Sequence, residues 1–149
     1  MLRERYEPET WAWLLDEDGA ALPVCHWESI IGRAAKKGAV EINCVQIRDY
    51  TENKQMQVDD YPYGGGWGLV MMAQPLKSCL DDIMSKAGSR RSRVIYMSPQ
   101  GRPFNQEEAK RLRRDYDHLV LVCGHYEGVD ERFIEECVDA VSYTHLRAH

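Results

Sequence analysis

Short aliphatic segments alternate with helix-length segments through the middle of this 149-residue chain. The expected strands are the β-branched run Val40 to Ile47, the run Arg93 to Met97 and the aliphatic run Leu119 to Val122. Strands separated by helix-length segments indicate an α/β fold with a parallel sheet. The third run has no polar interruption, which is typical of a strand at the centre of such a sheet. The length suits one domain with one hydrophobic core.

Cap-forming and helix-breaking residues delimit the helices. The expected helices run from Ser29 to Gly38, from Pro75 to Gly88, from Asn105 through Leu112 and from Asp130 to Cys137. Serine and asparagine are preferred N-cap residues, and Asn105 with Glu108 three positions later resembles a capping box. Proline suits a first helical turn and glycine a helix end. Neither Met1 to Trp27 nor the polar tail Ser142 to His149 shows a clear element signal.

The formal net charge of −5 argues against a protein that binds nucleic acid through its overall charge. Two basic clusters could contact RNA locally, but such clusters are more often solvated faces: Arg90, Arg91 and Arg93, and Lys110, Arg111, Arg113 and Arg114. The five cysteines are scattered and form no Cys-x-x-Cys pair, which indicates reduced thiols. No apolar run approaches the ~18 residues that span a bilayer. We therefore expect a cytoplasmic protein without a membrane partner.

A polar, glycine-rich loop from Arg48 to Gly68 interrupts the alternation of elements. Its last part has four glycines in five residues, which permits positive φ angles and a close backbone approach to a ligand. The glycine spacing matches neither common phosphate-binding motif. A flexible surface loop and a binding loop are both compatible with the glycines alone. The acidic pair Asp59 and Asp60, flanked by Tyr61 and Tyr63, favours the binding loop.

Two further segments follow expected strands, where ligands bind in parallel sheets. The first, Tyr96 to Gly101, could also be an ordinary tight turn, since proline and glycine are common in turns. The second is Cys123 to Arg132. Its Cys123 and His125 are too few to make a metal site, so we expect no metal. Its three acidic residues could be general bases or solvated charges near a helix start: Glu127, Asp130 and Glu131.

These segments together resemble the tRNA (guanine-N1)-methyltransferase family of the SPOUT class, in order and approximate spacing. The matching stretches are Ser29–Ala34, Ile47–Thr51, Val58–Gly68, Val94–Gly101 and Cys123–Arg132. The strings Asp-Asp-x-Pro-Tyr-Gly-Gly-Gly and Gly-His-Tyr-Glu-Gly-x-Asp-Glu-Arg are long and unusual, so they carry most of the resemblance. It extends from Ser29 to Val138.

The resemblance implies a homodimer with a deep trefoil knot. It also implies transfer of a methyl group from S-adenosylmethionine (AdoMet) to N1 of the tRNA guanine that follows the anticodon. One wall of the cofactor pocket would be formed by Tyr96, Ser98, Pro99 and Gly101, and a second wall by Gly124, Tyr126 and Glu127. The loop that meets the target guanine across the dimer interface would contain Asp59, Asp60, Pro62, Tyr63, Gly64, Gly65, Gly66 and Gly68.

The two ends of the chain depart from the family pattern. Residues 1–28 lack the family's first strand, and 139–149 do not match its AdoMet-closing loop. The family's catalytic Asp, its supporting Arg and its helical tRNA-binding domain follow that loop. We therefore expect residues 29–138 to be a partial methyltransferase domain with an incomplete knot and no catalytic base. The alternative to an active enzyme is a truncated remnant that at most dimerises or binds adenosine weakly.

Overall fold

The computed structural model describes residues 33, 37–43, 45–62, 65–124 and 127–143. The chain forms two compact units, Met1–Asp49 and Tyr50–His149. The expected helix start at Ser29, the segment Met1 to Trp27 and the tail beyond Tyr143 lie outside the described residues.

In the first unit, Gly38 has the backbone conformation expected of it, but the expected strand is not seen. Gly38 has a φ of 68°, as expected for a glycine that ends a helix. The prediction of a strand from Val40 to Ile47 is wrong, because the described residues of this run form no strand and a 3-10 helix, η4 (Ile47–Tyr50), begins at its end. Val40 is 42% exposed. A β-branched run forms a strand only when another strand pairs with it and covers one face, and no described residue pairs with this one.

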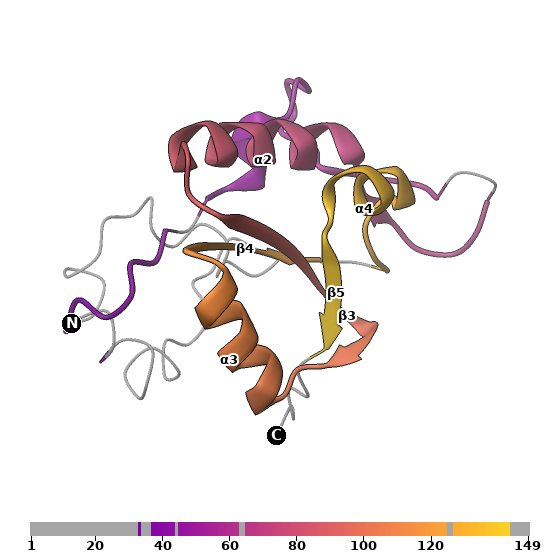
Figure 1. Cartoon of the computed structure of the whole chain (residues 1–149). Helices are drawn as coiled ribbons and strands as arrows, with labels where there is room; N and C mark the ends of the chain where they lie inside the picture. The colour runs from indigo at the N-terminus through magenta and orange to yellow at the C-terminus, as the bar shows by residue number, and fades with distance from the viewer. Residues whose placement is uncertain (1–32, 34–36, 44, 63–64, 125–126, 144–149) are drawn as a thin grey trace. The chain divides into compact units, whose positions relative to one another are not determined.

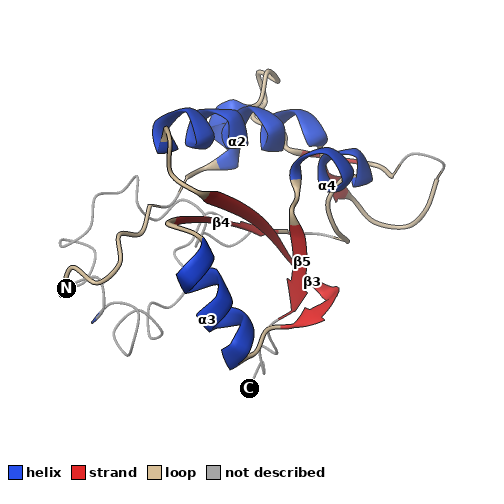
Figure 2. Ribbon diagram, in the orientation of Figure 1, coloured by secondary structure: helices blue, strands red, loops and turns tan. Residues whose placement is uncertain are grey.

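The second unit contains a parallel sheet in the order β4-β3-β5, as Figure 2 shows. The strands are β3 (Ser92–Pro103), β4 (His118–Cys123) and β5 (Ala140–Tyr143). This confirms the predicted α/β fold with a parallel sheet. The prediction that the aliphatic strand lies at the centre is wrong for the sheet formed by the described residues, in which β4 lies at an edge and β3 at the centre. Only alternate residues of β4 are buried, and Leu119 and Leu121 remain 42% and 58% exposed.

Strand β3 is longer than expected, and β5 was not expected at all. The predicted break after Met97 is a register shift between Met97 and Arg102, after which β3 resumes its pairing with β5. Strand β5 includes Ser142, which is buried, so regular structure extends into the segment from Ser142 onward, where the sequence shows no element signal. Four residues of mixed polarity are too few to show a strand period, and only pairing with β3 defines this strand.

The three helices of this unit begin and end close to the predicted positions. They are α2 (Ala73–Ala87), α3 (Gln106–Asp115) and α4 (Glu131–Cys137). Gly88 ends α2 with a φ of 63°, and the Asn105 side chain accepts a hydrogen bond of 2.9 Å from the Glu108 N–H at the start of α3. Asp130 caps α4 in the same way by accepting from the Arg132 N–H. These caps confirm the predicted helix boundaries.

Helices cover both faces of the sheet. Helices α2 and α4 contact each other on one side, and α3 lies on the other side (Figure 1). The buried apolar residues of α2, α4 and the sheet form the core, among them Leu76, Leu80, Val94, Ile95 and Phe133. Within the described residues, each helix is too short or too polar to cross a membrane. Cys123 and Cys137 are free thiols and Cys79 is buried, whereas Cys25 and Cys44 lie outside the described residues.

Candidate functional site

A short antiparallel pairing closes the glycine-rich loop. Strand β1 (Asp59–Asp60) pairs with β2 (Val70–Met71), so that the two ends of the loop lie side by side. The Asp60 carboxylate accepts a hydrogen bond of 2.7 Å from the backbone N–H of Tyr61. The first turn of the loop is therefore fixed by the second residue of the acidic pair. Tyr63 and Gly64, both expected in the substrate loop, lie outside the described residues.

The described glycines of this loop have backbone angles that favour glycine. Gly65, Gly66 and Gly68 have φ values of 84°, 151° and 94°. Gly66 also approaches Pro62, because a Cβ added at Gly66 would lie 3.3 Å from the Pro62 Cγ. A Cβ added at Gly68 would lie 2.3 Å from the Glu127 Cγ, which is closer than carbon atoms pack. The absence of a side chain at position 68 thus allows the loop to contact Glu127.

Backbone hydrogen bonds join the end of this loop to the segment that follows β4. The Glu127 N–H donates to the Leu69 carbonyl at 3.0 Å, and the Met71 N–H donates to the Gly128 carbonyl at 2.9 Å. The Asp130 N–H then donates to the Met71 carbonyl at 2.9 Å. These three bonds hold the glycine-rich loop against the segment after β4, and their geometry depends on no particular side chain.

Tyr96 joins the second candidate segment to the third. Tyr96 in β3 pairs with Val122 of β4. Gly124 therefore follows just beyond the paired residues of β4. A Cβ added at Gly124 would lie 3.0 Å from both the Cε2 and the hydroxyl oxygen of Tyr96, and one added at Gly128 would lie 3.9 Å from that oxygen. The three segments singled out in the sequence therefore meet at the carboxyl end of β4 and beside Tyr96 in β3, just before the register shift of that strand.

The pKa values of two side chains near this meeting point, Tyr96 and Asp130, are shifted. Burial raises the pKa of the Tyr96 phenol above its usual value, and a hydrogen bond with Ser98 acts weakly in the opposite direction. Tyr96 is therefore neutral at physiological pH. The Arg132 guanidinium, 2.6 Å from the Asp130 carboxylate, lowers the pKa of Asp130. Asp130 is a helix cap and ion-pair partner, which argues against a role as a general base.

The remaining residues of the expected cofactor wall continue along β3. The Ser98 hydroxyl accepts a hydrogen bond of 3.3 Å from the Gln100 N–H, and Pro99 is exposed. Gly101 packs directly on β5, since a Cβ added there would lie 2.6 Å from the Ser142 backbone nitrogen. Tyr126, expected in the second wall, lies outside the described residues.

Sequence reasoning missed several residues that shape this region. Gly128 contacts the Tyr96 hydroxyl region, and Leu69 and Met71 supply the backbone bonds described above. The apolar run after Gly68 was the available signal for a second strand at the loop's end. No such pattern in the sequence indicates that Ser142 lies in a strand.

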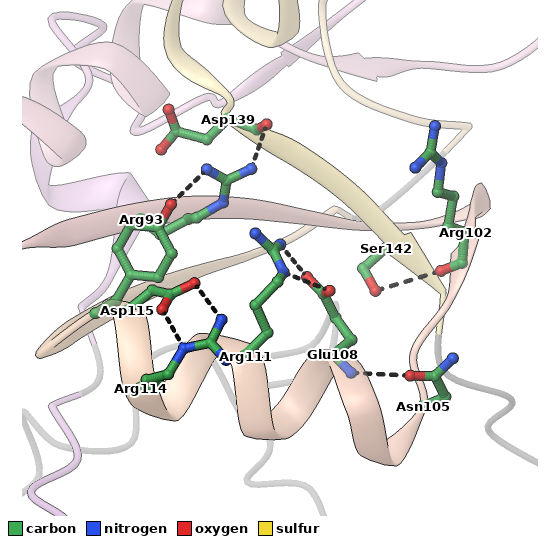
Figure 3. A network of polar contacts seen from close by, with 10 residues as sticks. Arg93, Arg102, Asn105, Glu108, Arg111, Arg114, Asp115, Asp139 and Ser142 are labelled. Carbon is green, nitrogen blue, oxygen red and sulfur yellow. Dashed lines mark hydrogen bonds and ion pairs between the residues drawn. The ribbon is translucent and has the colours of Figure 1, made fainter.

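Acidic side chains neutralise much of the two basic clusters. Arg111 pairs with Glu108, Arg114 with Asp115 and Arg91 with Asp117. Figure 3 shows the first two of these pairs along α3, together with Arg93, whose guanidinium donates to the Asp139 carbonyl. Exposed pairs of this kind contribute little to stability, because solvent screens both charges. They reduce the positive charge that these clusters could present to RNA.

Comparison with known proteins identifies the family. The model of the family described as tRNA (Guanine-1)-methyltransferase TrmD matches residues 20–144, well over half of the chain. A tRNA (guanine-N(1)-)-methyltransferase of Ruminiclostridium cellulolyticum is 55% identical over 112 residues, which are 75% of this chain and 47% of that protein. A protein of the same name from Lachnospira eligens is 51% identical over 110 residues, 74% of this chain and 46% of that protein. The chain thus spans about half the length of the curated relatives it matches. It belongs to the tRNA (guanine-1)-methyltransferase family.

Proposed function

We propose that this chain forms the AdoMet-binding part of a tRNA (guanine-N1)-methyltransferase, which methylates N1 of the guanine that follows the anticodon. The single observation that carries this proposal is the meeting of the glycine-rich loop, Tyr96 and the segment after β4, at the carboxyl end of β4 and next to the register shift of β3. Ligands of open α/β sheets bind at such ends. Family membership adds the chemistry that this arrangement serves.

The methyl donor would lie between the two walls expected from the sequence: Tyr96, Ser98, Pro99 and Gly101, and Gly124, Tyr126 and Glu127. The Gly124 backbone is exposed and has no side chain, which leaves its main-chain groups open to such a ligand, and its contact with the Tyr96 ring joins the two walls at one end. Backbone donors and acceptors at strand ends suit the edge of adenine. When bound, AdoMet supplies a methyl group on a positively charged sulfur, which makes transfer a direct displacement.

The glycine-rich loop would hold the target guanine beside this donor. Its residues are Asp59, Asp60, Pro62, Tyr63, Gly64, Gly65, Gly66 and Gly68. In the transfer, the methyl group would pass from the sulfur to guanine N1, S-adenosylhomocysteine would leave, and the N1 proton would pass to a base. The chain's contribution is alignment of the two reactants and exclusion of water. We assign the base to none of the described residues and require no metal.

The family's assembly is part of the same proposal. We propose a homodimer in which the loop of one copy meets the guanine across the interface, a SPOUT-class fold, and action on tRNA in the cytoplasm. No observation on the described residues favours the alternative of an inactive remnant.

Calorimetry with AdoMet tests the donor site, and transfer of labelled methyl groups to tRNA tests the reaction. We expect AdoMet to bind the unaltered chain and Gly124→Val to abolish binding, because a branched side chain would displace the Tyr96 ring. A matched control is Ser89→Val, at an exposed position beyond the end of α2. Absence of AdoMet binding by the unaltered chain would contradict the proposal, and weak adenosine binding without methyl transfer would support the remnant instead.

A further inference from the structure

The glycine-rich loop carries two large aromatic side chains that are open to solvent. Trp67 is 100% exposed and Tyr61 is 76% exposed. An indole is the largest apolar side chain, and its complete exposure is unusual in a folded unit. Its neighbours in sequence, Gly66 and Gly68, have no side chains that could cover it. The loop thus presents an uncovered aromatic surface.

This aromatic surface is anchored next to the proposed methyl-transfer site. Trp67 immediately precedes Gly68, whose backbone contacts the Glu127 side chain. The hydrogen bond from the Glu127 N–H to the Leu69 carbonyl fixes the chain two residues after Trp67. The pairing of β1 with β2 fixes the loop as a whole. The position of Trp67 relative to Glu127 is therefore set by the backbone.

We infer that Trp67 is a stacking platform for the target guanine of the RNA. The inference rests on the proposed function. Methylation at N1 requires the Watson–Crick edge of the base, so the guanine must leave its stack and lose those contacts. The methyl group approaches N1 in the plane of the ring, which leaves both ring faces free to contact an aromatic side chain. A flat indole supplies such a contact for any base.

The test compares RNA binding by variants of the chain with an RNA hairpin that carries the anticodon-loop guanosine. A second hairpin has an abasic ribose in place of that guanosine. We expect Trp67→Ala to weaken binding of the first hairpin by about 5- to 150-fold, the range that loss of one stacked base implies. Trp67→Phe keeps a stacking ring and should lose far less. For the abasic hairpin, Trp67→Ala and the unaltered chain should bind alike.

Controls separate stacking from other effects. Phe104→Ala removes another exposed aromatic side chain, at the far end of β3, and should leave binding unchanged. Thermal unfolding should be unaffected by Trp67→Ala, since that side chain packs on nothing. Equal binding of the first hairpin by Trp67→Ala and the unaltered chain would overturn the inference but not the proposed function. Failure of the unaltered chain to bind the hairpin would contradict the tRNA part of the proposed function. A change in sedimentation of the free protein with Trp67→Ala would instead assign Trp67 to contact with a second copy.

Discussion

Gly65 and Gly68 share a left-handed backbone, but only Gly68 has a neighbour within contact range of an added Cβ. Gly65→Ala should therefore destabilise the fold by about 1–2 kcal/mol, from backbone strain alone. Gly68→Ala adds overlap with Glu127, and overpacking of this kind typically costs a further ~1–3 kcal/mol. Urea denaturation of both variants measures the difference. Equal losses would show that Glu127 moves away freely and that the contact is not a fixed part of the site.

His118 makes the stability of the fold depend on pH, and a substitution at this position can measure its share. Its Nδ1 lies 2.9 Å from the Ser92 hydroxyl oxygen, and burial together with Arg90 lowers the pKa of His118 below the usual 6.5. As the pH falls below 6.5, the unfolded chain binds this proton before the folded chain does. The free energy of unfolding should therefore decrease from that pH down to the folded-state pKa.

Thermal unfolding measured between neutral and mildly acidic pH checks this dependence. The chain has five histidines, so the comparison is with His118→Gln, which keeps a polar side chain that does not titrate. Between neutral and mildly acidic pH, the melting temperature of the variant should fall less than that of the unaltered chain. Identical pH profiles for the two proteins would show that His118 does not cause it.

At the scale of elements, β4 lies at the edge of the sheet that the described residues form, and one of its faces is largely apolar. Leu119 and Leu121 project from this strand with 42% and 58% of their surface exposed. An exposed apolar edge strand is a site for pairing with another chain. We expect the isolated chain to self-associate as its concentration rises, and Leu121→Lys to reduce that association.

Sedimentation velocity over a concentration series measures this effect. Met84→Lys is the matched control, since Met84 lies on α2 and is 37% exposed. It adds the same charge away from the strand edge. If both variants reduce association equally, net charge is the cause and the β4 edge is not. If neither does, the self-association arises elsewhere.

Across the whole second unit, the features that sequence predicted are those with local causes. The ends of α2, α3 and α4 depend on residues such as Gly88, Asn105 and Asp130, whose caps act within one helical turn. The order of strands depends on pairing between distant segments. For this reason the sequence wrongly places β4 at the centre of the sheet and does not predict β5. It correctly predicts that β4 is an aliphatic strand.

The candidate site shows the same difference between features with local causes and features that depend on contacts between distant segments. The sequence identified its three segments, because glycine, proline and acidic residues cluster visibly at Asp59–Gly68, Tyr96–Gly101 and Cys123–Arg132. It could not show that Gly68 contacts Glu127 or that Tyr96 covers Gly124, since both contacts arise from the fold. The individual roles of these residues in binding AdoMet and guanine remain predictions.

The close packing of Gly101 on Ser142 constrains how this protein can diverge. A side chain at position 101 would meet main-chain atoms 2.6 Å away, and no substitution at position 142 can remove a main chain. A substitution at position 142 therefore cannot make room for a side chain at position 101. Only an inserted or deleted residue that moves β5 bodily would relax the restriction, so we expect lineages to retain glycine here even where neighbouring positions drift.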